Sequence, residues 1–591
     1  MRTIKQVLPV NTGMEWLMSQ TDPDLIFIPE DFSEEQKMIR DMCRNFISQN
    51  IIPRLDHKRT VTPGVMRSLI KSTAEQGLLF AGLPEEYGGT GKDFVTTTII
   101  MEELGVEGSY TVSSGVHSSL GTMPIVFFGT EEQKEKYLPN LVSGHWIGAY
   151  ALTEPNSGSD ALGAKTTAVL SSDGKYYLLN GQKCWISNGG FADVFTVFAK
   201  VDGNKFTGFI VEKNFEGFTR GEEEHKIGLK GSSTVQLFFQ DCKVPVENVL
   251  GEIGRGHVMA FNILNGGRYR LGAIGVGAGK ANITRSVEYA ITREQFKNPI
   301  ASFGAIKHKL AEMAIRTWVA ESSLYRTGKL INDKEIELMD DGNSYGNALL
   351  LALEEFSVEC AILKVTGSET LNYVVDEGVQ IHGGNGFSEE YEISKAYCDS
   401  RINRIFEGTN EINRLLIMNM LLKKAANGKI PLFKTPSLLV EKKTVYSIQH
   451  KNGNLFRREK NYVSNFKRAI VTLINLVVGK YKDTLESEQE ILMSLSDMII
   501  ETYNAESALL RVIKMAKTGS DYMLQADMMR TYFYEASHRI NKAGRDVLNA
   551  LEGNDELLSL LDELTKVRSF NTKEARRRIA AKMIEERKYC F

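Results

Sequence analysis

The sequence predicts a mostly α-helical protein with a central β domain. Apolar residues recur at intervals of three and four both before residue 148 and after residue 253, which is the period of an amphipathic helix. Between them, short segments rich in β-branched and aromatic residues are separated by Gly, Asn and Asp, as strands are. A chain of 591 residues is also too long for one hydrophobic core, so we expect several packed domains.

The first predicted domain is helical and covers residues 1–147. Apolar positions three and four apart mark helices in SEEQKMIRDMCRNFISQNII (33–52) and EEQKEKYLPNLVSG (131–144). Ser33 is placed to cap the first of these helices.

The β domain is expected at residues 148–253. Its clearest strand candidates are KYYLLNGQKCWIS (175–187), DVFTVFAKV (193–201), FTGFIV (206–211) and STVQLFFQDCKV (233–244). These segments are short and rich in the residue types that favour strands, so they predict a sheet between two helical regions.

The rest of the chain divides into three parts. Residues 254–425 form a second helical domain, 426–461 a linker with two prolines, and 462–591 a C-terminal helical domain without proline. Residues 421–461 hold ten Lys and Arg against two Asp and Glu, a net +8, with apolar residues interleaved. This pattern has two readings: a solvated basic loop, or a peripheral contact with an anionic membrane surface.

Composition excludes several classes of protein. A net charge of −3 gives no reason to expect a nucleic-acid partner. The six cysteines form no CxxC pair, which argues against a metal knuckle or disulfide framework and favours a reducing compartment. No segment reaches the roughly 20 apolar residues needed to cross a bilayer, and the N-terminus lacks the apolar core of a signal peptide.

The stretch RIFEGTNEINRLLIMNM (404–420) holds the strongest candidate for chemistry. Its apolar residues form one helical face, and Thr409 or Asn410 is placed to cap the helix. Glu407 therefore lies in a Gly-containing turn just before a helix N-terminus. In an apolar pocket its carboxylate would have a raised pKa suited to a general base. The alternative is a surface acid favoured by the helix dipole.

Three further segments are turn-like and rich in small residues. They are YALTEPNSGSDALGAKT (150–166), NGQKCWISNGG (180–190) and QIHGGNGF (380–387). Each is typical of a tight turn when taken singly, and Trp185 is either a stacking platform or a core residue. The GGNG run is no dinucleotide-binding fingerprint, because a helix precedes it instead of a strand.

Taken in order, these segments resemble the acyl-CoA dehydrogenase family. The resemblance covers roughly residues 35–425 and also includes LPEEYGG (83–89), LNGGR (264–268), TREQF (292–296) and RIFEGTNEI (404–412). It implies a fold with an N-terminal helical domain, a middle β-barrel-like domain and a helical bundle. The length and the extra helical C-terminal domain are most similar to the very-long-chain branch.

The resemblance implies FAD as the cofactor, bound without a Rossmann fold. The residues that it assigns to FAD are Leu152, Thr153, Gly158, Ser159, Trp185, Ile186, Ser187, Arg293, Gln295, Phe296, Gln380, Gly383, Gly384, Thr409 and Glu411. Part of each FAD site would come from a second chain, so the family implies a homodimer.

The resemblance also implies the reaction: α,β-dehydrogenation of a long or very long acyl-CoA to the trans-2-enoyl-CoA, as the first step of fatty-acid β-oxidation. Glu407 matches the base, and the alternative family position for that base holds Gly267. The substrate residues implied are Ser159, Asn265, Arg268, Val112, Val116, Phe406 and Gly408. The valines match positions where medium-chain members carry larger polar residues, which favours a deeper acyl tunnel.

The partners implied are an electron-transfer flavoprotein and, through 426–461, a membrane surface. The expected location is the cytoplasm of a prokaryote, with contact on the inner face of its membrane, or the mitochondrial matrix of a eukaryote. Two departures stand out: Lys297 replaces a glycine near the adenine end of FAD, and His382 stands where apolar residues are common. The alternatives are an acyl-CoA oxidase that uses O₂, and an assembly or scaffold protein on the same fold.

Overall fold

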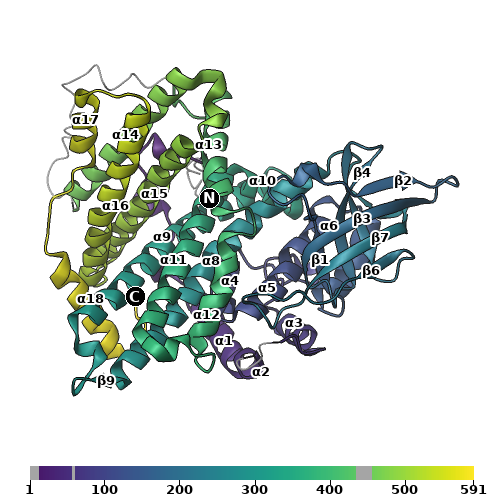
Figure 1. Cartoon of the computed structure of the whole chain (residues 1–591), viewed down its shortest axis with the longest axis horizontal. Coiled ribbons are helices and arrows are strands. Elements are labelled where there is room, and N and C mark those ends of the chain that lie inside the picture. The colour runs from purple at the N-terminus through teal and green to yellow at the C-terminus, as the bar shows by residue number, and fades with distance from the viewer. Residues whose placement is uncertain (1–11, 56–59, 434–454) are drawn as a thin grey trace, which may run out of the picture.

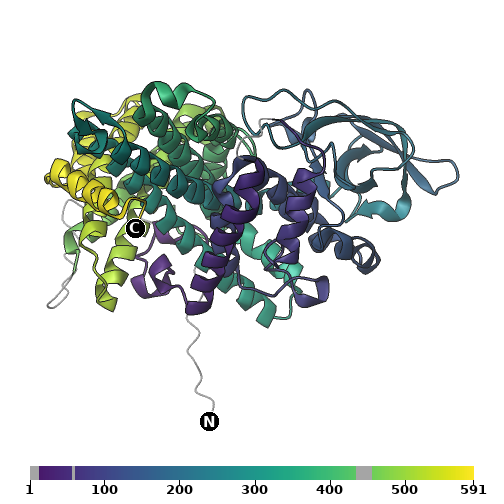
Figure 2. The same cartoon turned by 90° about the horizontal axis from the view of Figure 1, so that it is seen from below.

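The computed structural model describes residues 12–55, 60–433 and 455–591. A helical bundle forms the middle of the molecule, with the β domain on one side and the C-terminal helices on the other (Figure 1). The predicted fold class is therefore confirmed: helices with a central β domain in the sequence, followed by an extra helical domain. Viewed from below, the N-terminal helices lie across the junction between the bundle and the β domain (Figure 2).

The N-terminal region is helical. Its helices are α1 (Glu34–Phe46), α2 (Ile52–Leu55), α3 (Val65–Glu75), α4 (Phe94–Glu103), α5 (Gly108–Gly115), α6 (Met123–Phe128) and α7 (Glu131–Val142), with η7 (Val116–Gly121) continuing α5. Ser33 caps α1 as predicted, because its side chain accepts a hydrogen bond from the Gln36 N–H. Helix α4 packs against the long bundle helices, which attaches this domain to the bundle.

The β domain is one mainly antiparallel sheet. Its strands are β1 (Gly148–Ala151), β2 (Thr167–Leu170), β3 (Tyr176–Ser187), β4 (Val194–Val201), β5 (Lys205–Glu212), β6 (Phe218–Arg220), β7 (Thr234–Pro245) and β8 (Val249–Leu250). The order is β6-β7-β3-β2-β4-β5-β8, and β1 pairs in parallel with β4. The β3–β7 register shifts between Lys183 and Ile186. This irregularity frees Trp185 from the ladder and turns it outward.

The second helical domain supplies the central bundle. Its helices are α8 (Gly256–Thr292), α9 (Gly304–Asp340), α10 (Tyr345–Glu355), α11 (Ser357–His382), α12 (Glu392–Ser400) and α13 (Asn410–Ala426), with the hairpin β9 (Glu294–Gln295) and β10 (Asn298–Pro299). Helices α8 and α11 pack closely where glycines face each other: a methyl group on Gly367 would lie 2.8 Å from the Gly272 Cα. Any side chain there would force the two helices apart.

The C-terminal helices pack on the bundle of their own chain. They are α14 (Arg457–Tyr481), α15 (Gln489–Thr518), α16 (Met523–Ala550), α17 (Asp555–Thr565) and α18 (Thr572–Glu586). Helix α15 contacts α9 and α13, and one apolar core runs through both domains. Helix α14 begins inside the segment predicted as a linker, because residues 457–461 already belong to the helix.

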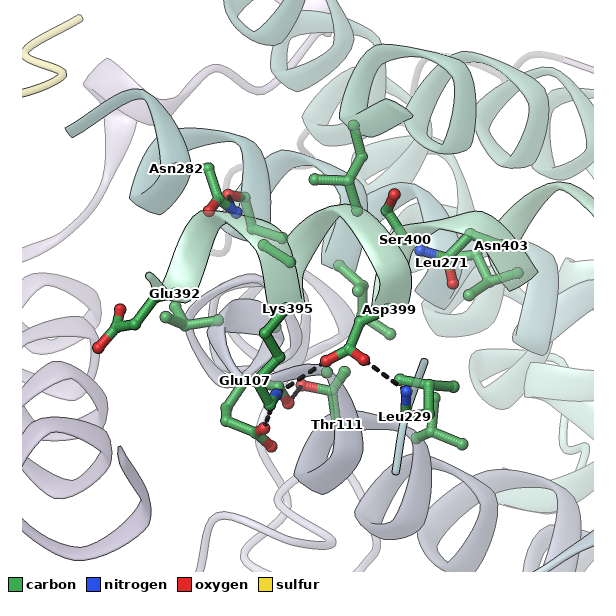
Figure 3. A pocket seen from close by; sticks show the side chains of 18 of the residues that line it. Glu107, Thr111, Leu229, Leu271, Asn282, Glu392, Lys395, Asp399, Ser400 and Asn403 are labelled. Atoms are coloured by element: carbon green, nitrogen blue, oxygen red, sulfur yellow. Dashed lines mark hydrogen bonds and ion pairs between the residues drawn. The ribbon is translucent and has the colours of Figure 1, made fainter. Parts of the chain in front are cut away.

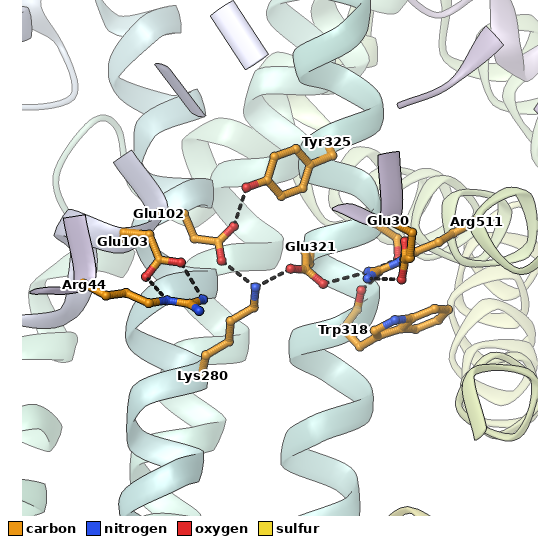
Figure 4. Close-up of polar contacts among 10 residues, drawn as sticks. Glu30, Arg44, Glu102, Glu103, Lys280, Trp318, Glu321, Tyr325 and Arg511 are labelled. Carbon is orange, nitrogen blue, oxygen red and sulfur yellow. Dashed lines mark hydrogen bonds and ion pairs between the residues drawn. The ribbon is translucent and has the colours of Figure 1, made fainter. Parts of the chain in front are cut away.

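A chain of buried charges links the domains (Figure 4). Lys280 of α8 donates to Glu102 of α4 and to Glu321 of α9. Arg511 of α15 donates to Glu321 at 2.7 Å and to Glu30 at 2.8 Å. Each carboxylate thus meets at least one cation, which offsets the cost of removing the charges from water.

Most of the basic segment predicted to contact a membrane, residues 434–454, lies outside the described residues. Within the described ranges, no helix is long and apolar enough to cross a bilayer.

Candidate active site

Glu407 lies in a strained turn just before α13. Its φ of 57° is left-handed, which is uncommon for a residue with a side chain. Thr409 caps α13 by accepting a hydrogen bond from the Ile412 N–H at 3.2 Å. Lys364 Nζ donates to the Gly408 carbonyl at 2.7 Å, and Asn413 Nδ2 donates to the same oxygen at 2.9 Å. These two side chains hold the backbone in the turn.

One oxygen of the Glu407 carboxylate has no hydrogen-bond partner among the described residues. This oxygen, Oε2, is buried. Burial raises the pKa of Glu407 to about 7, although Arg268 and Lys364 act in the opposite direction. A carboxyl group with this pKa exchanges protons near neutral pH, as a general base must.

Helix α8 forms the wall against that carboxylate. A methyl group on Gly267 would lie 2.7 Å from Glu407 Oε2, so the carboxylate occupies the space that a side chain would fill. Arg268 Nη1 donates to Asn265 Oδ1 at 2.7 Å, and Arg268 Nε reaches the Glu407 carbonyl at 3.4 Å. Asn265 and Arg268, both predicted from the sequence, therefore lie beside Glu407.

The second wall belongs to the β domain. Trp185 has a φ of 60°, and its side chain is 60% exposed, so it is a surface platform and not a core residue. The loop after β1 is fixed beside it: the Cys184 N–H donates to the Thr153 carbonyl at 3.0 Å. Lys183, fully buried, donates to the Leu152 carbonyl at 3.2 Å and to Glu154 at 2.7 Å.

Tyr150 connects the two walls. It precedes the loop that holds Thr153, and its hydroxyl donates to the Ala260 carbonyl of α8 at 3.4 Å. Burial and, after it, the charge of Glu407 raise the pKa of Tyr150 well above its ordinary value. The hydrogen bond to α8 ties the start of the β domain to the helix that carries Gly267 and Arg268.

Other predicted residues in these walls differ in exposure. Ile186 is buried in the sheet, whereas Ser159 and Gly158 are exposed, and a methyl group on Gly158 would meet only open space. Phe406 and Ser187 are partly buried, and Glu411 is exposed in the first turn of α13.

A third group of predicted residues lies at the other end of the bundle. Arg293, Gln295 and Phe296 are exposed on or beside the β9–β10 hairpin, and the Phe296 side chain is 87% exposed. The turn after α11 lies next to this hairpin, since the Tyr289 hydroxyl donates to the His382 carbonyl at 3.1 Å. His382 also stacks on Tyr289, and burial lowers its pKa, which is a structural role.

This third group includes Gln380, Gly383 and Gly384, which are all exposed. A methyl group on either glycine would meet nothing within 4 Å. In Figure 1 the label β9 lies at the opposite end of the bundle from β3, which carries Trp185. Within one chain, the hairpin group therefore lies apart from the β domain that carries Trp185.

The predicted tunnel valines lie in different surroundings. Val112 lines a cavity of about 660 Å³ under α12, shown in Figure 3. There Lys395 donates to Glu107 and to Asp399, and Asp399 accepts from the Leu229 N–H of the β domain. Val116 packs instead against the core shared by the N-terminal helices and the β domain. Their role in substrate length stays a prediction.

Sequence reasoning missed the residues that hold the Glu407 turn. Lys364 sits on α11 between apolar residues, where a lysine in ECAILKVTG is the only charge between Glu359 and Glu369. A lone lysine on a buried helical face was a signal of a specific partner, because lysine is seldom buried unless paired. Asn413 gave no comparable signal.

The arrangement suits removal of a weakly acidic proton. Glu407 supplies a carboxylate with a pKa near neutrality. Trp185 supplies an exposed aromatic surface on the β domain.

Family models match four parts of the chain. The models described as acyl-CoA dehydrogenase N-terminal, middle and C-terminal domains match residues 33–145, 149–242 and 254–422. A further model, also described as an acyl-CoA dehydrogenase C-terminal domain, matches residues 465–566.

Individual proteins match over most of the chain. A "Probable acyl-CoA dehydrogenase" of Bacillus subtilis is 45% identical over 590 residues, which is 99% of each chain. The "Very long-chain specific acyl-CoA dehydrogenase, mitochondrial" of Bos taurus is 35% identical over 83% of this chain and 77% of its own. A crystal structure of an acyl-CoA dehydrogenase complexed with FAD from Bacillus anthracis superposes with a TM-score of 0.94, at 44% identity, covering 98% of this chain and 100% of that one.

Proposed function

The chain belongs to the acyl-CoA dehydrogenase family, and from this premise we propose that it oxidises long or very long acyl-CoA with Glu407 as the base. It is an enzyme of the oxidoreductase class, and FAD is its cofactor. The chain-length proposal is supported by the similarity to the bovine very-long-chain enzyme, which extends over 83% of this chain.

The residues of this chain fit FAD. Trp185 offers an exposed aromatic face, and the backbone around Gly158 is open to close approach. At the hairpin end, the open glycines after α11 and the exposed Arg293 suit a phosphate and adenine group. When bound, FAD supplies the acceptor for the electrons that leave the β-carbon.

The single observation that carries the proposal is the Glu407 carboxylate. An α-proton beside a thioester is too weakly acidic to be removed unless the developing negative charge is stabilised. In the proposed mechanism, the backbone N–H of Glu407 donates to the thioester oxygen, and the Glu407 carboxylate takes the proton from the α-carbon. Lys364 and Asn413 keep both groups in place by fixing the turn.

The separation of the two predicted FAD regions supports a homodimer. The β domain with Trp185 and the β9–β10 hairpin lie at opposite ends of the bundle. A second copy related by a two-fold axis would bring its hairpin to the FAD site of the first chain. By the same symmetry, the hairpin of the first chain would reach the FAD site of the second. The C-terminal domain occupies the outer face of the bundle, next to α9 and α13.

Anaerobic flavin bleaching tests the proposed reaction. We expect acyl-CoA thioesters to reduce the flavin of the purified holoenzyme, with the fastest bleaching at long chains in a series from about four to twenty carbons. If no thioester in the series bleaches the flavin, the proposed function is wrong.

The electron acceptor needs a separate measurement. We propose an electron-transfer flavoprotein as the acceptor, so turnover should require that protein, and little oxygen should be consumed without it. Formation of hydrogen peroxide at the full turnover rate would identify an oxidase instead.

A further inference from the structure

A largely apolar cavity lies beside α8. Its empty space is about 1000 Å³, partly open to solvent, between α4, η7, α8 and α10. Its lining is mostly hydrophobic and includes Leu79, Phe80, Ile100, Met123, Phe127 and Leu349. Walls of this kind favour a hydrocarbon chain over a small polar ligand.

Arg270 is one of three charged residues in this mostly apolar wall, with Lys92 and Glu335. It follows Gly267, the glycine beside Glu407, by one turn of α8, which is a rise of about 4.5 Å along the helix axis. Its guanidinium lies over bare backbone, because a methyl group on Gly115 would come within 2.9 Å of Arg270 Nε. The cavity therefore begins next to the proposed site of proton removal.

The hydrogen bonds of Arg270 are incomplete. Nη1 donates to Ser118 Oγ at 3.0 Å, but the buried Nε makes no hydrogen bond within the described part of the chain. A guanidinium has five N–H donors in a planar fork that matches a carboxylate. Arg270 thus keeps donor capacity that a bound ligand can use.

Arg270 also has no counter-ion in residues 12–55, 60–433 and 455–591, where no carboxylate forms an ion pair with it. Two other buried arginines differ: Arg326 pairs with Glu506 at 3.0 Å, and Arg511 pairs with Glu321 at 2.7 Å. Burial lowers the pKa of Arg270 to about 10, so it remains cationic at neutral pH. An unpaired buried charge is costly, and an incoming anion would remove that cost.

Glu335, which lines the same cavity, does not serve as that counter-ion. Burial and then the charge of Asp93 raise the pKa of Glu335 to about 7. Among the described residues, no ion pair joins its carboxylate to Arg270, whose Nη1 donates to Ser118 instead.

We propose that this cavity takes the distal part of the acyl chain and that Arg270 binds a carboxylate on that chain, which makes ω-carboxyacyl-CoA the preferred substrate class. The inference rests on the proposed function and names the substrate of that same site. The apolar walls hold the methylene groups, and the guanidinium binds the terminal carboxylate through its two parallel N–H donors.

Matched thioesters test this proposal. For chains of about eight to sixteen carbons, flavin reduction in the holoenzyme is compared between the plain acyl-CoA and the ω-carboxyacyl-CoA of equal length. The wild type should favour one ω-carboxyacyl-CoA by about tenfold or more in kcat/KM, since a charge-assisted hydrogen bond contributes about that factor.

Arg270→Met should abolish that preference, and Arg270→Lys should keep part of it, because lysine retains the charge but not the fork. Arg285→Met is the matched control on the same helix: Arg285 forms an ion pair with Glu392 at 2.7 Å and should leave the ratio unchanged. FAD content and circular dichroism check that each variant folds. If Arg270→Met does not fold, the preference between the two thioesters in Arg270→Lys tests the proposal.

Three results would overturn the proposal. The first is a wild-type enzyme that prefers the plain thioester at every length. The second is an equal ratio in wild type and both Arg270 variants. The third is a pair of results: free fatty acid inhibits the wild type but not the Arg270 variants, and the preference between the two thioesters is the same in all of them. That pair would assign the cavity to the free acid. If plain acyl-CoA bleaches the flavin, any of these three results leaves the proposed function intact. If no thioester bleaches it, both the proposed function and this proposal are wrong.

Discussion

Glu407 and Glu321 are two buried carboxylates beside α8 that the fold treats in opposite ways. Glu321 is 2% exposed and lies between Lys280 and Arg511. Burial would raise its pKa, but these cations outweigh that effect and lower it. Glu407 has one oxygen without a partner and a pKa raised to about 7. Pairing keeps a carboxylate charged and structural, whereas incomplete pairing prepares it to accept a proton.

The largest expected effect is on the chemistry of Glu407. Glu407→Gln should slow flavin reduction by acyl-CoA by about 10²–10⁴-fold, the usual contribution of a general base. FAD content should not change, because the amide fills the same space. Stopped-flow flavin absorbance measures this rate, and a variant that reacts as fast as the wild type would remove Glu407 from the mechanism.

The same substitution should not destabilise the fold. A folded-state pKa raised to about 7 stabilises the protein at low pH, and that stabilisation is lost as the pH rises through 7. Above that pH the wild type carries a buried charge that glutamine lacks. The thermal midpoint of Glu407→Gln at pH 8 should therefore equal or exceed that of the wild type.

Glu321→Gln should show the reverse pattern. Removing this charge leaves Lys280 and Arg511 short of a partner, and breaking a buried ion pair costs about 3–5 kcal/mol of stability. Thermal unfolding followed by helical circular dichroism should show a clear drop, while flavin reduction by the folded variant stays near the wild-type rate. Glu585→Gln, which removes a pair 3.4 Å long at an exposed site, is the control and should leave unfolding unchanged.

A smaller effect is expected where α8 meets Glu407. In Gly267→Ala the new methyl group would lie 2.7 Å from Glu407 Oε2, so the carboxylate must move. We expect flavin reduction to slow by about 10- to 100-fold, because displacement of a reacting group by about 1 Å has an effect of that size. Gly266→Ala is the neighbouring control: its methyl group would meet only Leu353, at an ordinary 3.5 Å, and should have a much smaller effect.

The smallest effect is a change with pH. Only the deprotonated carboxylate accepts a proton, and the pKa of Glu407 is about 7. In single-turnover measurements with limiting substrate, the reduction rate should fall about tenfold per pH unit below 7 and level off above it. A rate that is constant from pH 5 to 8 would show that the free enzyme does not hold this base at a raised pKa.

The sequence could predict those parts of the molecule that depend on neighbouring residues. Periodicity identified the helices and strands, and Ser33 and Thr409 were recognisable as caps because a cap acts within three residues. The turn at Glu407 was predictable for the same reason. The resemblance assigned Asn265 and Arg268 to the substrate, and the structure places both beside that turn.

The rest depends on partners that are far apart in the chain. Arg511 meets Glu321 across 190 positions, and Lys364 meets Gly408 across 44. No local pattern distinguishes Glu321, which is paired, from an ordinary helical glutamate. Arg270 is equally inconspicuous in the sequence. Only the packing of α8 against η7 shows that its guanidinium lines a mostly apolar cavity, where no carboxylate of the described residues pairs with it.

The glycine at position 267 also limits how this enzyme could evolve. A glutamate introduced there would collide with the carboxylate of Glu407, which already fills that space. The base could therefore migrate from the turn before α13 to α8 only if both positions changed together, or through an intermediate that has lost the Glu407 side chain. Each single substitution gives an enzyme with two colliding side chains or one without a catalytic base. The location of the base should therefore persist while the acyl cavity diversifies around it.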